Sequence, residues 1–285
     1  MRIVYTLTGV CNSNCLHCYR KGSLAIARDL SECEKDILVL RNKGYQITLA
    51  GAEVLTNEEY LGLYQLVGQD YLLSNGILLA KNSELCNKLI SYRINKVHIS
   101  WHIGFQSIIS NIQESIIKKA IENSLKSGLE ITVNCVISNR NFLLLEKISK
   151  QVLKIGAKKI RLLQLLPVQK ELKRYQLTGD QKNAVFEQVK RLRQIYSKEV
   201  LDVRLHGNFS PMLAEKSIQS SNEGKFCPAG NNFFTIEINN KVYPCPFLTQ
   251  PQFQLGFWRD GQIIIENTIP NNGKSCLAEK LLIIN

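Results

Sequence analysis

Apolar residues in the first two-thirds of the chain recur at two different spacings. Short runs with the pattern of β-strands predict strands at residues 2–8, 46–50, 70–74, 96–101, 130–137 and 159–165. Between and after them, apolar residues at helical spacing predict helices at residues 29–43, 56–67, 82–92, 107–127, 142–156 and 178–196. Strands that alternate with helices are joined by crossovers and therefore run parallel. The pattern predicts six consecutive βα units.

Six such units with right-handed crossovers are expected to curl into an open, partial (β/α)6 barrel of the α/β class, with its chemistry at the carboxyl ends of the strands. After about residue 200, Gly, Asn and Pro become frequent, and residues 233–238 and 241–243 have the pattern of a β-hairpin. We therefore predict a barrel domain at residues 1–199 and a small, cysteine-bearing α+β extension at residues 200–285.

Composition narrows the class of protein. A chain of 285 residues, 45% of them hydrophobic, can bury a full core. The formal charge of +12 favours anionic partners such as acidic peptides, phosphorylated molecules or RNA, or it serves solubility alone. The basic residues lack interleaved aromatics, which disfavours a dedicated nucleic-acid surface. Neither a signal peptide nor an apolar run of membrane-spanning length is present, so we expect a cytoplasmic protein without a membrane partner.

Three of the nine cysteines, Cys11, Cys15 and Cys18, lie within eight residues directly after the first predicted strand. One loop with this spacing can wrap a single inorganic centre. A zinc site normally has four protein ligands, so zinc would need His17 or a distant residue as the fourth ligand. A 4Fe-4S cluster with one open iron needs no further ligand from the protein.

The CxxxCxxC spacing after a first strand, with the aromatic Tyr19 beside the last cysteine, resembles the signature of the radical S-adenosylmethionine (SAM) superfamily. The resemblance implies that the amino and carboxylate groups of SAM chelate the open iron. It also implies that one electron, from a donor such as flavodoxin or ferredoxin, releases a 5'-deoxyadenosyl radical that abstracts hydrogen from a substrate carbon. His17 then occupies the position of a side chain that packs on the adenine.

Other segments resemble the cofactor loops of the same superfamily. Gly51-Ala52-Glu53 is similar to its Gly-Gly-Glu segment, and Ser74-Asn75-Gly76 to the Thr-Asn-Gly after its third strand. Alanine at position 52 would cost about 1 kcal/mol if a positive φ were required there. Strand alternation directs Trp101 and Cys135 toward the helices, and Ser100, His102 and Asn134 toward the barrel interior. The implied cofactor contacts are His17, Gly51, Ala52, Glu53, Ser74, Asn75, Ser100, Asn134 and, as a polar residue in an apolar run, Gln164.

The later cysteines form a second group. Cys227-Pro-Ala-Gly and Pro-Cys245-Pro flank the predicted hairpin and resemble the start of the SPASM and Twitch extensions, which hold an auxiliary iron-sulfur cluster. With Cys276 they would supply three thiolates, and the fourth ligand could be Asp202, His206, substrate or water. A disulfide or a zinc clip is the alternative. Cys33 and Cys86 lie on predicted helices and are expected to be buried packing residues, or else donors of a hydrogen atom to a substrate radical.

By analogy with SPASM and Twitch enzymes, we expect radical modification of a peptide, giving an epimerised residue, a thioether or a carbon crosslink during maturation of a ribosomally made (RiPP) precursor. The first alternative is a radical SAM dehydrogenase of an aminosugar or a nucleotide. The second is a zinc-binding adaptor without catalysis. The sequence assigns no catalytic residue beyond the cofactor ligands.

Overall fold

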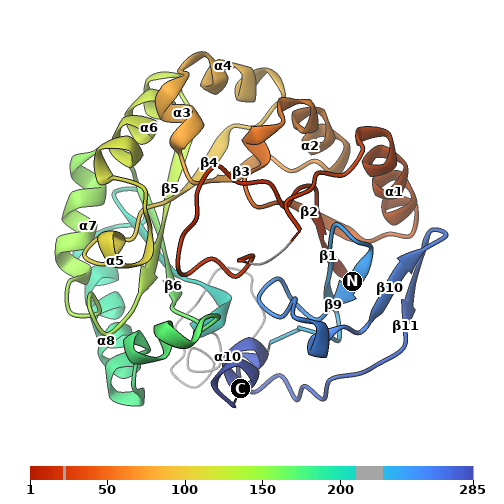
Figure 1. Ribbon diagram of the computed structural model, residues 1–285. Coiled ribbons are helices and arrows are strands. Elements are labelled where there is room, and N and C mark those ends of the chain that lie inside the picture. The colour runs from red at the N-terminus through yellow and green to blue at the C-terminus, as the bar shows by residue number, and fades with distance from the viewer. Residues whose placement is uncertain (22–23, 210–226, 285) are drawn as a thin grey trace.

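The computed structural model describes residues 1–21, 24–209 and 227–284 (Figure 1). The strands are β1 (Arg2–Thr6), β2 (Gln46–Ala50), β3 (Tyr71–Ser74), β4 (Lys96–Ser100), β5 (Glu130–Ile137), β6 (Lys159–Gln164), β7 (Asp202–Leu205), β8 (Phe233–Ile236), β9 (Lys241–Tyr243), β10 (Gly256–Arg259) and β11 (Gln262–Ile265). The α-helices are α1 (Leu30–Asn42), α2 (Leu61–Val67), α3 (Ile77–Lys81), α4 (Glu84–Ser91), α5 (Gln106–Ile109), α6 (Glu114–Lys126), α7 (Leu145–Lys154), α8 (Gly179–Ile195) and α10 (Leu277–Ile284). Short 3-10 turns are η1 (Val54–Thr56), η2 (Glu58–Tyr60), η3 (Lys170–Tyr175), η4 (Gly207–Phe209) and η5 (Pro251–Phe253).

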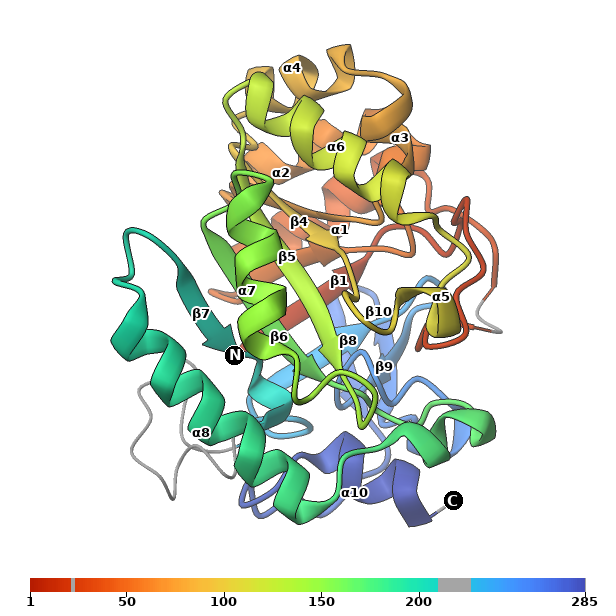
Figure 2. The same cartoon turned by 90° about the vertical axis from the view of Figure 1, so that its left-hand side faces the viewer.

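Two sheets form the arc of a partial barrel. Strands β3 to β7 pair in parallel in chain order, and β1 pairs in parallel with β2 on one side and β8 on the other. Helices α1 to α4 and α6 to α8 lie outside this arc in Figure 1, and Figure 2 shows α6, α7 and α8 along the outer face of the five-stranded sheet, with α5 apart from them. The predicted α/β partial barrel is confirmed. Strand β7, which the hydrophobic pattern did not predict, continues the sheet beyond β6.

Two predicted helices are each divided. The segment at residues 56–67 begins with the turn η2 before α2, and the one at residues 107–127 is split into α5 and α6. The second break follows from Ser110, which adopts an extended conformation, and its Oγ accepts a hydrogen bond from the Ile112 amide at 3.2 Å. A serine that bonds its own backbone in this way competes with helical hydrogen bonds. No helix in the described ranges has both the length and the apolar content needed to cross a membrane.

Alternation on β4 continues past its last residue and separates the two faces of the sheet. The Trp101 ring lies under the ammonium group of Lys118 on α6, at 5.6 Å from the ring centroid, so this residue faces the helices. His102 faces inward and contacts the His17 ring. Cys33, Cys86 and Cys135 are fully buried among apolar side chains, as predicted for packing residues.

A side chain joins the two sheets between β2 and β3, which belong to different sheets. The side-chain oxygen Oε1 of Gln69 accepts a hydrogen bond from the backbone N–H of Leu49 at 2.8 Å. Its Nε2 donates to the backbone carbonyls of Leu49 at 3.3 Å and Tyr71 at 2.9 Å. Gln69 is buried, so these backbone groups have little access to water. The glutamine therefore satisfies backbone groups that a neighbouring strand would otherwise bond.

The C-terminal segment is attached to the barrel at two places. Strand β8 extends the sheet of β1 in parallel, and β9, β10 and β11 follow in antiparallel order. At the other place, Glu279 of α10 forms an ion pair with Lys182 of α8 and accepts a hydrogen bond from Gln164 of β6. The cysteines of this segment are therefore held against both ends of the arc.

Replacing Gln69 with alanine should lower the free energy of unfolding by about 1–3 kcal/mol, because the buried Leu49 amide loses its partner. Urea unfolding followed by circular dichroism measures this change. The matched control is Gln65→Ala on the exposed face of α2, which should stay within about 0.5 kcal/mol of the wild type. Equal effects of the two substitutions would contradict the role assigned to Gln69.

Candidate cofactor site at the carboxyl ends of the strands

Cys11, Cys15 and Cys18 lie on one loop that follows β1. In Figure 1 this loop, in dark red, passes across the opening enclosed by the arc of strands. A turn closed by a hydrogen bond from the Cys18 amide to the Cys15 carbonyl, at 3.2 Å, joins two of the three cysteines. Burial raises the pKa of Cys11, and the nearby Cys18 and Cys15 sulfurs raise it further. Within residues 1–21, 24–209 and 227–284, no three His, Cys, Asp or Glu side chains converge on one point as ligands of a single ion do.

The break between α5 and α6 supports this cysteine loop. Ser110 Oγ lies 3.3 Å from the Cys15 sulfur, and Asn111 Oδ1 accepts a hydrogen bond from Ser13 Oγ at 2.7 Å. The sequence interpretation ran one helix through these residues and so missed them. The sequence does contain a signal for this break, because Ser110 and Asn111 are of residue types that favour turns over helix interiors.

Two neutral histidine rings stand beside the loop. The rings of His17 and His102 meet edge to face with centroids 4.4 Å apart. His17 Nδ1 lies 3.0 Å from the Ile109 carbonyl, so it donates, and His102 Nδ1 accepts from the Val136 amide at 3.2 Å. Burial lowers the pKa of both rings. The backbone therefore selects opposite tautomers, leaving Nε2 of His17 an acceptor and Nε2 of His102 a donor.

The segment after β2 packs directly on the chain after β1. A Cβ atom on Gly51 would lie 2.9 Å from Thr8 Cγ2 and 3.2 Å from the Thr8 carbonyl oxygen, so only glycine allows this approach. The next residue, Ala52, donates its amide hydrogen to the same carbonyl at 2.8 Å. Its φ is not positive, so alanine at this position carries no strain.

Glu53 connects the loops after β2 and β3. It is 1% exposed, and its carboxylate accepts hydrogen bonds from the Asn75 amide at 2.7 Å and from Ser74 Oγ at 3.1 Å. Burial raises the pKa of Glu53 to about 7, although these two hydrogen bonds oppose the rise. The Asn75 side chain continues to the cysteine loop, donating to Asn12 Oδ1 at 2.8 Å, with Cys11 Sγ 3.7 Å away.

Two predicted interior residues on β4 and β5 are neighbours. Ser100 is paired with Asn134 in the register of the sheet. The Oδ1 atom of Asn134 is buried and has no hydrogen-bond partner in the described part of the chain. Such an acceptor fits a ligand hydroxyl or amine on the inner face. The side-chain amide of Gln164, at the end of β6, donates a hydrogen bond to Glu279 of α10 at 2.5 Å.

The second group of cysteines is also brought together. Cys245 and Cys276 are buried, Cys227 is half-buried, and all three belong to one apolar cluster with Leu248 and Leu277. Burial raises the pKa of Cys245, and it raises that of Cys276 to about 12. The neighbouring thiols raise both pKa values further.

The backbone around Cys276 opposes its desolvation. Amide groups of Ala278 and Glu279, in the first turn of α10, hydrogen-bond its sulfur and favour the thiolate. Of the two protein side chains considered as a fourth ligand, His206 has its ring centroid 6.3 Å from that of Phe247, two residues after Cys245. Asp202 begins β7 and is paired with Arg204.

Two contacts join the first cysteine loop to the second. Tyr19 packs edge to face on Phe247, with ring centroids 4.9 Å apart. The next residue, Arg20, forms a buried ion pair with Glu237, at 2.8 Å between Nη1 and Oε2. The sequence interpretation did not find Arg20 or Glu237, because nothing in a single sequence relates two residues so far apart.

Comparisons with known proteins bear on this arrangement. No protein-family model matches the chain, and a search of curated proteins found no significant match. Among solved structures, SuiB of Streptococcus suis bound to precursor peptide SuiA aligns with 99% of this chain and 64% of its own, at 13% identity and a TM-score of 0.69. Native anSMEcpe with bound AdoMet and Cp18Cys peptide aligns with 91% of this chain and 77% of its own, at 16% identity and a TM-score of 0.69. The chain shares the fold of these two proteins.

This fold agrees with the groups at the mouth of the barrel. A radical SAM cofactor needs three thiolates on one loop and polar groups around the nucleotide. The chain provides the thiols, the two neutral histidines and the unpaired Oδ1 of Asn134 at one end of the strands, so the residues present fit the group. The chain spans 64% of the length of SuiB.

Glu53 should make stability depend on pH in a defined direction. Because burial raises its pKa to about 7, the folded state favours the protonated carboxyl, and this stabilisation is lost as the pH rises through 7. Compared with a Glu53→Gln variant, the wild type should lose roughly 2–3 kcal/mol of unfolding free energy between about pH 5 and pH 8. Urea unfolding at both pH values measures it, and parallel curves for the two proteins would refute the raised pKa.

Proposed function

We propose that the chain is a radical SAM enzyme. The single observation that carries the proposal is that the loop with Cys11, Cys15 and Cys18 contacts the loops after β2, β3 and β4 at one end of the strands. Cys11, Cys15 and Cys18 would hold a 4Fe-4S cluster, with SAM at the open iron. When bound, these two groups supply a 5'-deoxyadenosyl radical that abstracts hydrogen from a substrate carbon.

In this proposal, the residues around the cysteines bind and orient the cofactor. His17 and His102 are uncharged, so they can line an adenine site without adding a positive charge beside a sulfonium. Asn134 Oδ1 offers an unused acceptor at the register level of Ser100, suited to a ribose hydroxyl. Glu53 and Asn75 set the position of two loops relative to Cys11. Positioning of this kind, with exclusion of water, is the contribution a protein makes to cofactor chemistry.

For Cys227, Cys245 and Cys276 we propose an auxiliary iron-sulfur cluster. Their side chains pack in or against one apolar cluster beside α10, and thiolate ligands suit such clusters. The similar structures named above include one bound to precursor peptide SuiA and one bound to Cp18Cys peptide, which supports a peptide substrate here as well. Modification of a ribosomally made precursor is therefore the favoured reaction class, with flavodoxin or ferredoxin as the electron donor.

The two cysteine groups should have separable roles. Cys15→Ala should abolish reductive cleavage of SAM, because it removes a ligand of the cluster that binds SAM. Cys245→Ala should retain cleavage, because its sulfur belongs to the other group. Cleavage is measured as 5'-deoxyadenosine released by anaerobically reconstituted protein under dithionite.

Cys86→Ala is the matched control, since this thiol is buried on α4 and belongs to neither group. It should cleave SAM as the wild type does. Wild-type rates in the Cys15 variant would overturn the proposed function. Loss of cleavage in the Cys245 variant would contradict the separation of the two groups.

A further inference from the structure

Two arginines contact the ring of the buried Tyr175 at the carboxyl ends of β5 and β6. The guanidinium carbon of Arg174, on η3, lies 4.8 Å from the Tyr175 ring centroid, and that of Arg140, after β5, lies 5.5 Å from it. Asn139 joins the two loops by two hydrogen bonds. Its backbone N–H donates to the Tyr175 carbonyl at 3.1 Å, and its side-chain Nδ2 donates to the Arg174 carbonyl at 2.8 Å. Both guanidinium groups are thus held over one ring.

In the part of the chain that the structure describes, no acidic side chain balances these two charges. Arg140 and Arg174 are exposed, and neither forms an ion pair with an acidic side chain in the described part of the chain. Lys170 and Lys173 on η3 add positive charge, and Glu171 on the same turn pairs with none of them. Like charges held on one ring repel each other, so a bound anion would lower the electrostatic energy of this region.

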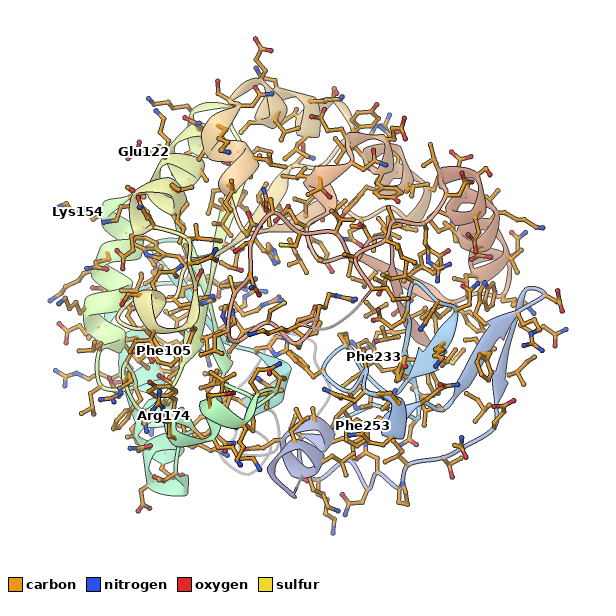
Figure 3. All side chains as sticks on the ribbon, in the orientation of Figure 1. Phe105, Glu122, Lys154, Arg174, Phe233 and Phe253 are labelled. Carbon is orange, nitrogen blue, oxygen red and sulfur yellow. The ribbon has the colours of Figure 1, made fainter. Side chains whose placement is uncertain are left out.

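The arginines stand beside the mouth of the barrel. The Tyr175 ring meets the Phe105 ring at 5.2 Å, and both belong to an apolar cluster with Ile109. Leu16, which lies between Cys15 and Cys18, packs against this cluster. One layer of apolar side chains therefore separates the arginines from the cysteine loop, and Figure 3 shows Phe105 and Arg174 on the same side of the molecule.

We propose that this basic rim, formed by Arg140, Lys170, Lys173 and Arg174 around Tyr175, docks an acidic segment of the peptide substrate. The inference rests on the proposed function for the peptide class. Carboxylates match the planar guanidinium group through paired hydrogen bonds. A single-stranded nucleic acid would also need aromatic faces for its bases, whereas Tyr175 is only 7% exposed and its face is covered by the arginines.

The test is the binding of a fluorescein-labelled peptide of eight glutamates to the reconstituted protein, measured by anisotropy. A double Arg140→Gln/Arg174→Gln variant should bind about tenfold more weakly, as expected for two exposed charge pairs. The control Lys147→Gln/Lys154→Gln removes the same charge from exposed lysines of α7, and in Figure 3 Lys154 points outward at the edge. It should change the affinity less than twofold, and added salt should weaken wild-type binding.

The double Arg140→Lys/Arg174→Lys variant should recover most of the affinity, which separates a role in charge from damage to the loops. Equal losses in the Arg→Gln and control variants would overturn the proposal, because net charge alone would then explain binding. Equal or tighter binding of a uridine octanucleotide, lost in the same Arg→Gln variant, would overturn it in favour of RNA. SAM cleavage by the same wild-type preparation separates the two proposals: cleavage without peptide binding refutes only the basic rim, and binding without cleavage refutes only the proposed function.

Discussion

The buried ion pair between Arg20 and Glu237 is the contact on which the site depends most. Arg20 follows the cysteine loop, Glu237 follows β8, and Arg20 also donates to Thr6 Oγ1 at the end of β1. A buried charge without its partner costs roughly 3–5 kcal/mol, so neither side chain can leave alone. Arg28 adds hydrogen bonds to the carbonyls of Thr6 and Glu237. The position of the three N-terminal thiols is thereby set by a strand from the far end of the chain.

Polar contacts between loops also fix the cysteine loop at the mouth of the barrel. Polar contacts reach the N-terminal cysteine segment from three sides: from Asn75 after β3, from Ser110 after β4, and from Glu237 after β8 through its ion pair with Arg20. The second group of cysteines meets the first through Tyr19 and Phe247. A cofactor, an auxiliary centre and a basic rim would then share one end of the fold, which suits a substrate that is long enough to touch more than one of them.

Much of this arrangement could be predicted from local pattern. Period-two alternation placed Trp101 toward the helices and His102 inward, because a strand offers only two faces. The cysteine loop could be identified from the spacing of its cysteines, because the whole motif lies within eight adjacent residues. Two kinds of feature could not be predicted: contacts between residues far apart in the sequence, and local structure decided by competition between weak interactions. The Arg20–Glu237 pair and the amide of Gln69 between two sheets are of the first kind, and the break at Ser110 inside an apolar period is of the second.

The central claim is that three thiolates hold a cluster whose remaining corner binds SAM. Electron paramagnetic resonance of the anaerobically reconstituted, dithionite-reduced chain, recorded before and after addition of SAM, tests it most directly. The account predicts the spectrum of a reduced 4Fe-4S cluster whose line shape changes when SAM is added, because the ligand binds an iron atom. A protein that takes up zinc in place of iron, or a cluster signal that SAM leaves unchanged, would contradict it.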